Sequence, residues 1–175
     1  LQFLAGQYID ILLKDGKRRS FSIANAPHDD EFLQLHARNY PGGVFTEHVF
    51  TTMKVKDMLR FRGPLGSFFL RDTPEGVPII FLASGTGFAP IKSILEHVFF
   101  QEKKRGSKQK IILYWGARTK ADLYLTDLPE QWQREHENFT YIPVLSEPLV
   151  SDHWERRTGL VHQAVLQDFN DLNAY

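Results

Sequence analysis

The 175-residue chain contains no cysteine. This absence excludes disulfides, thiolate zinc sites and a cysteine-ligated iron–sulfur cluster from the chain itself. Charge of either sign is not in excess, because 21 Lys and Arg residues balance 21 Asp and Glu residues, so charge favours neither a nucleic acid nor an anionic membrane as partner. The sequence also lacks a signal peptide and an apolar run of membrane-spanning length. We therefore expect a cytoplasmic protein without a membrane partner.

The first part of the chain, up to about Leu70, has the pattern of antiparallel strands. Apolar and polar residues alternate in short runs, with turn-forming residues between them. One helix is expected after Gly42-Gly43, where apolar residues recur at helical spacing. We predict an antiparallel β-barrel or sandwich here. The predicted strands lie in GQYIDILL, RRSFSIAN, FLQLHAR and MLRFRG.

The second part of the chain, from Pro78 onward, alternates apolar strands with amphipathic helices. This alternation is typical of a parallel sheet that is covered by helices on both faces. RDTPEGVP at residues 71–78 has the composition of a linker, so we predict two domains, residues 1–72 and 73–175. The predicted elements of the second domain lie in PIIFLA, FAPIKSILEHVFF, KIILYWGA, LPEQWQREH, FTYIPVLS and LVHQAVLQDF.

A glycine turn interrupts the apolar sequence IIFLASGTGFAPIKSIL at residues 79–95. A strand that ends at Gly85-Thr86-Gly87 and leads into a helix directs backbone N–H groups and a positive helix end at one point, which suits a phosphate. The turn has no following Lys-Ser or Lys-Thr pair, and Pro90 stands where GxGxxG would have its third glycine. By itself the turn fits a tight strand-to-helix connection equally well.

Three predicted parallel strands end in polar or small residues. In open α/β sheets, ligands bind beyond the carboxyl ends of the strands, so Ser84, the segment 116–118 and Ser146-Glu147 can line one crevice. Glu147 could accept hydrogen bonds from ribose hydroxyls and repel a 2′-phosphate, which favours NADH over NADPH. Arg118 could bind the pyrophosphate. Both residues have a plain alternative as solvated surface charges.

A series of motifs along the chain resembles the ferredoxin–NADP reductase superfamily. Within this superfamily, the chain is similar to the branch that contains the NADH-dependent reductase components of bacterial ring-hydroxylating oxygenases and the CDP-6-deoxy-glucoseen reductase of the CDP-deoxysugar pathway. The resemblance covers nearly the whole chain in order. Its motifs are FLAGQY (3–8), RSFS (19–22), LHAR (35–38), GGVFT (42–46), GPLGSF (63–68), SGTGFAPI (84–91) and YWGAR (114–118).

The resemblance assigns the RSFS motif to the flavin. It implies that Arg19 pairs with flavin phosphate, as suits a guanidinium, and that Ser20 belongs to the same binding strand. It further implies that Phe21 packs against the isoalloxazine or its ribityl side and that Ser22 offers its hydroxyl near N5. As alternatives, Phe21 could be ordinary barrel core, and Arg18 or Lys17 could serve the phosphate.

Two further segments are assigned to the same cofactor by resemblance. His36, Ala37 and Arg38 match a strand that runs beside the dinucleotide, although His36 could equally be a structural histidine, and we assign it no metal role. The helix start at residues 43–46 matches the one that holds the flavin pyrophosphate, and its residues are Gly43, Val44, Phe45 and Thr46. Thr46 could instead be only a helix cap. FAD is favoured over FMN.

The implied function is that of a flavin-dependent oxidoreductase. NADH would give a hydride to FAD, with Ser22 and Thr86 stabilising charge on the flavin, and electrons would pass to an iron–sulfur protein or domain outside this chain. Phe21 replaces the Tyr of the family motif, as in flavin reductases that hold flavin loosely, so a diffusible flavin reductase is an alternative. The family also has further opening strands and a later Cys-Gly strand. We therefore expect a piece of a longer protein, or a non-catalytic nucleotide-binding module if the chain is naturally this short.

Overall fold

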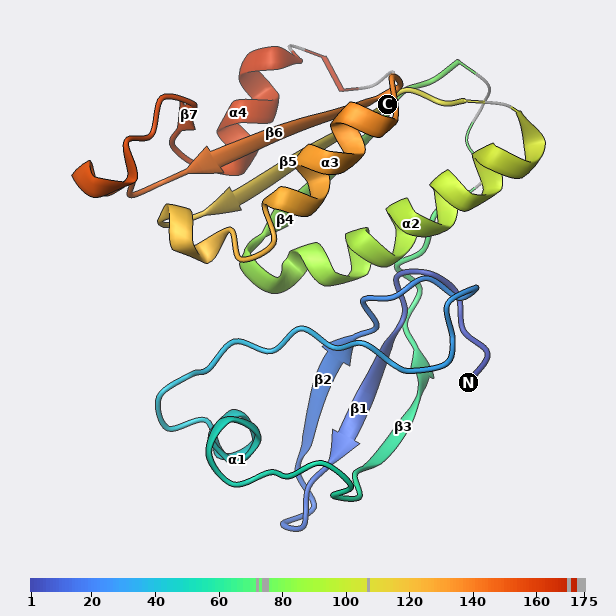
Figure 1. Cartoon of the computed structure of the whole chain (residues 1–175), viewed down its shortest axis with the longest axis vertical. Coiled ribbons are helices and arrows are strands. Elements are labelled where there is room, and N and C mark those ends of the chain that lie inside the picture. The colour runs from blue at the N-terminus through green and yellow to red at the C-terminus, as the bar shows by residue number, and fades with distance from the viewer. Residues whose placement is uncertain (72, 74–75, 107, 170, 173–175) are drawn as a thin grey trace. The chain divides into compact units, whose positions relative to one another are not determined.

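The computed structural model describes residues 1–71, 73, 76–106, 108–169 and 171–172. It divides into two compact units (Figure 1). Unit 1 comprises Leu1–Arg71 with Ala89–Lys104, and unit 2 comprises Asp72–Phe88 with Arg105–Tyr175. The predicted linker at 71–78 lies partly outside the described residues, at 72, 74 and 75. The domain boundary after residue 72 therefore stays a prediction.

Unit 1 contains a three-stranded antiparallel sheet in the order β2-β1-β3. Its strands are β1 (Tyr8–Leu12), β2 (Arg18–Ser22) and β3 (Arg60–Leu65), and helix α1 covers Val44–Thr51. Alternate residues of β1, Ile9 and Ile11, are buried and pack with Ile23 and Phe45. The predicted antiparallel architecture of this part is confirmed, and its core lies on the face of β1 that the alternation indicates.

The predicted strand in FLQLHAR is wrong, because the structure has only an isolated antiparallel bridge between Ile23 and Leu35 there. The side chain of Asn25 replaces the ladder at this point. Its Nδ2 donates to the backbone carbonyls of Asp29 and Phe32, and its Oδ1 accepts the N–H of Gln34. An amide that satisfies the backbone groups of a loop removes the need for strand pairing.

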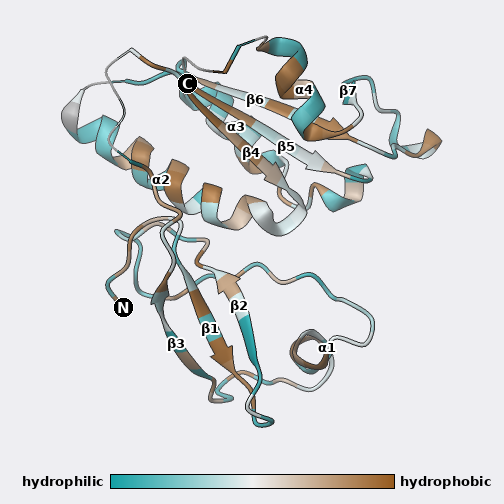
Figure 2. Ribbon diagram, turned by 180° about the vertical axis from the view of Figure 1, so that it is seen from behind, coloured by the Kyte–Doolittle hydropathy of each residue, from teal (hydrophilic) through white to brown (hydrophobic). Residues whose placement is uncertain are grey.

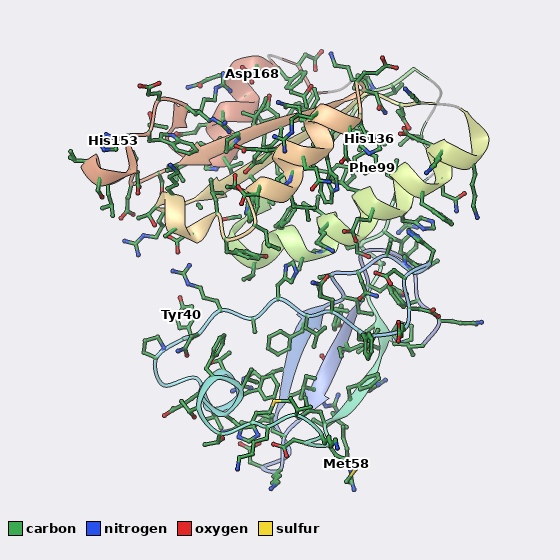
Figure 3. All side chains as sticks on the ribbon, viewed as in Figure 1. Tyr40, Met58, Phe99, His136, His153 and Asp168 are labelled. Atoms are coloured by element: carbon green, nitrogen blue, oxygen red, sulfur yellow. The ribbon has the colours of Figure 1, made fainter. Side chains whose placement is uncertain are left out.

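The predicted strand in MLRFRG begins later than expected, at Arg60, and continues through the cis Gly63-Pro64 bond to Leu65. Met58 lies outside it and is 96% exposed (Figure 3).

The 18-residue helix α2 (Phe88–Arg105) contributes most of its length to unit 1. The buried Lys92 ammonium donates to the Ala24 carbonyl at 3.2 Å and to Gln34 Oε1 at 3.0 Å, and it forms an ion pair with Glu96. A buried cation needs this full set of partners. Among the described residues, α2 and the other helices are not both long enough and apolar enough to cross a membrane.

His36 lies half-buried in unit 1, in the field of the Lys92 charge. Burial, aided by Lys92, lowers the pKa of His36 to about 4. The side chain is therefore neutral at pH 7 in the folded protein.

Unit 2 is a four-stranded parallel sheet in the order β4-β5-β6-β7. The strands are β4 (Ile79–Ser84), β5 (Ile111–Ala117), β6 (Phe139–Leu145) and the short β7 (Arg157–Thr158). The helices are α3 (Asp127–Glu135) and α4 (Val161–Asp168), with 3₁₀ turns η1 (Gly85–Gly87), η2 (Lys120–Asp122) and η3 (Val150–Asp152). The predicted parallel α/β architecture is confirmed, whereas β7 was not predicted.

Alternate residues of β5 face opposite sides of this sheet, as in any β-strand. Ile112 and Tyr114 pack with Val165 of α4. On the other face, Trp115 stacks on Phe88 with ring centroids 4.0 Å apart. The residues of β5 from Ile111 to Gly116 are all buried, which is the pattern of a strand covered on both faces. Hydrophobic residues are brown in the ribbon of Figure 2, for example along much of β4.

Helix α4 is fixed to the sheet by one polar network. The Tyr114 hydroxyl donates to Asp168, and the Arg157 guanidinium makes a bidentate ion pair with the same carboxylate. Burial raises the pKa of Asp168, but the hydrogen bonds from Arg157 and Tyr114 outweigh burial and lower it. Asp168 lies at the end of α4 (Figure 3), so this network holds the end of the helix against the sheet.

The lowered pKa of His36 predicts a pH dependence of stability. In the unfolded protein the imidazole has its ordinary pKa of 6.5, so it binds a proton below about that pH. In the folded protein it stays neutral down to about pH 4. The free energy of unfolding should therefore fall as the pH decreases from 6.5 towards 4. His36→Gln should flatten this part of the profile, measured by urea unfolding across the range.

The matched control is His162→Gln, since His162 is exposed on α4. A profile that His36→Gln leaves as steep as in the wild type would show that other groups cause the slope.

Candidate functional site

The flavin residues predicted in β2 lie on two faces of that strand. Arg19 pairs with Ile11 and Phe21 with Ile9, so both share the face of the buried β1 residues. Ser20 and Ser22 lie on the other face. The structure therefore does not bring all four residues of the motif to one surface.

The side chains of these residues already have local partners. The Arg19 guanidinium is exposed and donates to the Arg18 carbonyl at 2.8 Å. Ser20 Oγ donates to Asp10 across the β1–β2 pair at 2.6 Å. Phe21 is half-buried, with its ring 5.4 Å from that of Phe45. The ring of Phe21 is thus partly in the core, in line with the alternative that Phe21 is an ordinary core residue.

The predicted phosphate cradle of unit 1 is the first turn of α1. Gly43 occupies the position before Val44, and a Cβ added there would lie 2.4 Å from Thr46 Oγ1. Thr46 Oγ1 donates to the Gly43 carbonyl at 3.1 Å, and α1 has no side-chain hydrogen bond at its N-cap. The first N–H groups of α1 have no partner within the helix. A bare backbone at a helix start fits an anion such as a pyrophosphate.

The third predicted flavin segment has no regular structure. His36 and Ala37 are half-buried and Arg38 is exposed, in the stretch that follows the Leu35 bridge. Because no strand forms at 36–38, these residues are held by loop packing, and neutral His36 contributes no charge at pH 7.

The predicted nucleotide cradle of unit 2 is the turn between β4 and α2. Gly85, Thr86 and Gly87 form the 3₁₀ turn η1, and Gly85 has a left-handed φ of +51°. A Cβ at Gly85 or Gly87 would meet nothing within 4 Å, so the backbone there is open to close approach. Ser84 and Thr86 are exposed on the same turn. The geometry fits a phosphate group beside the main chain.

The strand ends that were predicted to lie together do so. Ser84 pairs with Gly116, and Ala117 pairs with Leu145, so β4, β5 and β6 end at one edge of the sheet. Ser146 donates its N–H to the Ala117 carbonyl at 2.9 Å, and Glu147 donates its N–H to the Arg118 carbonyl at 2.8 Å. These backbone bonds extend the alignment beyond the strands.

Arg118 and Glu147 were predicted separately, but the structure joins them in one bidentate ion pair. Arg118 Nε and Nη2 donate to the two carboxylate oxygens at 3.1 and 2.7 Å. Hydrogen bonding from Arg118 lowers the pKa of Glu147. Both side chains are more than half exposed, so each retains donor or acceptor capacity towards a ligand.

Sequence reasoning missed Trp115 as a residue of this cradle. Its indole N–H donates to the Gly85 carbonyl at 3.0 Å, although the residue stands in the apolar run IILYW and reads as core. The one available signal was chemical, since a buried indole N–H needs an acceptor.

Comparison with known proteins assigns the two halves of the chain. Residues 1–70 match the family described as "Oxidoreductase FAD-binding domain", and residues 81–174 match the "Oxidoreductase NAD-binding domain". The first match contains the α1 cradle and the second contains η1 and the Arg118–Glu147 pair.

Relatives and a solved structure agree with this assignment. The CDP-6-deoxy-L-threo-D-glycero-4-hexulose-3-dehydrase reductase of Yersinia pestis is 41% identical over the whole chain, which covers 50% of that protein. The reductase component of phenol 2-monooxygenase from a Pseudomonas species is 36% identical over 97% of the chain and 47% of its own length. A crystal structure of a cytochrome P450 reductase from Amycolatopsis has a TM-score of 0.86 and 32% identity, covering 99% of this chain and 51% of the other.

The chain thus spans about half the length of the curated relatives it matches. Across that half, both family patterns occur in sequence and the two observed units have the expected sheets. The chain belongs to the oxidoreductase family that combines an FAD-binding domain with an NAD-binding domain.

Proposed function

We propose that this chain is the FAD- and NADH-binding part of a reductase that delivers electrons to an iron–sulfur protein or domain. The observation that carries the proposal is a pair of backbone cradles, one in each family-matched region. Gly43 opens α1 in the FAD-matched region, and Gly85–Gly87 lead into α2 from the NAD-matched region. Both present N–H groups at a helix start, as dinucleotide phosphates require.

In unit 1, the first turn of α1 would hold the flavin pyrophosphate and Arg19 would neutralise phosphate charge. The exposed guanidinium of Arg19 lies on the face of β2 that also carries Phe21. Phe21 would offer the flavin the part of its ring that Phe45 leaves free. Ser22, half-buried at the end of β2, would place its hydroxyl near N5.

In unit 2, η1 would hold the pyridine-nucleotide phosphates and Glu147 would bind the ribose. Its carboxylate is charged, because Arg118 lowers its pKa, and a 2′-phosphate would face that charge. This repulsion supports a preference for NADH over NADPH.

When bound, FAD would supply the redox chemistry, as the acceptor of a hydride from NADH and the donor of single electrons. The role of the protein's residues would be to orient the two nucleotides and to stabilise the charge that develops on the flavin. Hydrogen-bond donors at Ser22 and Thr86 would stabilise negative charge, and the cradles would fix both phosphates.

Flavin chemistry and the relatives' names support an iron–sulfur electron acceptor. The relatives are called reductases of a dehydrase and reductase components of oxygenases. A carrier that takes electrons singly from a flavin suits such partners, and the chain, which contains no cysteine, would rely on a cluster held elsewhere.

The proposal is tested by the visible spectrum of the purified chain with FAD, before and after anaerobic NADH. We expect a protein-bound flavin band that NADH bleaches. Flavin that remains bound but is not bleached would support only the unit 1 site, and failure to bind either nucleotide would overturn the proposal. Bleaching with flavin that separates on gel filtration would favour a diffusible flavin reductase.

Arg19 and Arg18 provide a matched pair for the flavin phosphate. Loss of a charge-assisted hydrogen bond costs about 1.5–3 kcal/mol, so Arg19→Gln should raise the Kd for FAD by about tenfold or more. Arg18→Gln removes the same charge from the opposite face of β2 and should change the Kd little. Equal effects, measured by fluorescence titration, would show that only the summed charge matters.

Glu147→Arg tests the nucleotide preference. The substitution removes the carboxylate and frees the Arg118 guanidinium for a 2′-phosphate, so the ratio of kcat/KM for NADPH to that for NADH should rise by about tenfold or more. Glu155→Arg makes the same charge change at another exposed position of unit 2 and serves as the control. An unchanged ratio in Glu147→Arg would remove Glu147 from the ribose site.

A further inference from the structure

Trp115 connects the interior of the parallel sheet to the backbone of η1. The side chain is fully buried on β5, and its Nε1 donates to the Gly85 carbonyl oxygen at 3.0 Å. The same oxygen also accepts the backbone N–H of Phe88. Two donors on one carbonyl hold it more firmly than the helix alone would.

The indole ring has little freedom to move. It stacks on Phe88 at 4.0 Å with an interplanar angle of 17°, and the ring of Tyr124 meets it edge-on at 5.3 Å. Phe88 directly follows Gly87 and begins α2. Trp115 therefore contacts the residues at both ends of the Gly85–Phe88 segment.

The held carbonyl determines the direction of a neighbouring donor. Gly85 O and the Thr86 N–H belong to one planar trans peptide group, so they point in opposite directions. With its oxygen directed inward to the buried indole, this peptide directs the Thr86 N–H away from the indole. Gly85 and Gly87 leave open space beside that backbone.

We propose that Trp115 is a positioning residue for pyridine-nucleotide phosphates: its indole N–H fixes the Gly85 peptide and thereby aims the Thr86 N–H at the ligand. The inference rests on the proposed nucleotide role of η1. Without the indole donor, the left-handed Gly85, with a φ of +51°, gains freedom to rotate its peptide plane. Ligand binding would then have to order the turn, and this entropic cost would weaken the affinity.

The test compares two buried tryptophans. Trp115→Phe keeps an aromatic ring against Phe88 and Tyr124 but removes the N–H donor. Trp132→Phe is the matched control, because Trp132 is also buried and its ring centroid lies 6.2 Å from that of Phe88, but it stands on α3 and not on β5. Calorimetry would give the Kd for NADH and for ADP, which has a pyrophosphate but no nicotinamide.

Trp115→Phe should raise both Kd values by about five- to tenfold, the size expected for one lost hydrogen bond, and leave the Kd for FAD unchanged. Trp132→Phe should leave all three unchanged, whatever it does to thermal stability. If Trp115→Phe binds NADH and ADP as tightly as the wild type, the inference fails. If the wild type binds neither nucleotide, the proposed function of η1 fails instead.

A second measurement needs no variant of Trp115. The chain has three tryptophans, so a spectrum of protein labelled with ¹⁵N at tryptophan shows few indole signals, which Trp132→Phe and Trp154→Phe assign by elimination. Adding ADP should shift the Trp115 indole signal more than that of Trp154, whose N–H donates to the Arg157 carbonyl. An unmoved Trp115 signal at saturating ADP would overturn the inference.

Discussion

The parallel hydrogen-bonded ladder of β4, β5 and β6 is the constraint on which the nucleotide site depends. Its register makes the strands end together, since Ser84 lies opposite Gly116 and Ala117 lies opposite Leu145. The polar residues of the proposed site lie at the ends of these strands or one to two residues after them. The short connections at Ser146 and Glu147 continue the same alignment, so the loops inherit their positions from the sheet.

The fold could be predicted to a large extent because its signals are periodic. Alternation identified the antiparallel strands of unit 1, and apolar runs followed by amphipathic helices identified the parallel sheet of unit 2. The glycine turn at 85–87 was also recognisable, because glycine, a strand end and a helix start coincide in the sequence. The strand expected in FLQLHAR failed because Asn25, outside the run, satisfies the backbone groups that a strand would have paired.

The features of the site that could not be predicted from the sequence are contacts between residues far apart in the chain. Arg118 and Glu147 are 29 positions apart, and nothing in the sequence tells that they pair with each other. Trp115 and Gly85 are 30 positions apart, and the tryptophan was hidden in an apolar strand. The ion pair holds the Arg118 and Glu147 side chains beside each other, which the position of neither residue in the sequence indicates.

The three-stranded sheet of unit 1 has β2 and β3 at its margins in the part of the chain that the structure describes. Unpaired strand margins can join those of another copy and lead to aggregation. Here both margins are basic, with exposed Arg18 and Arg19 on β2, the hydrophilic start of that strand in Figure 2, and exposed Arg60 and Arg62 on β3. Pairing two copies edge to edge would bring these guanidinium groups together, and their repulsion opposes such pairing less as salt shortens the screening length.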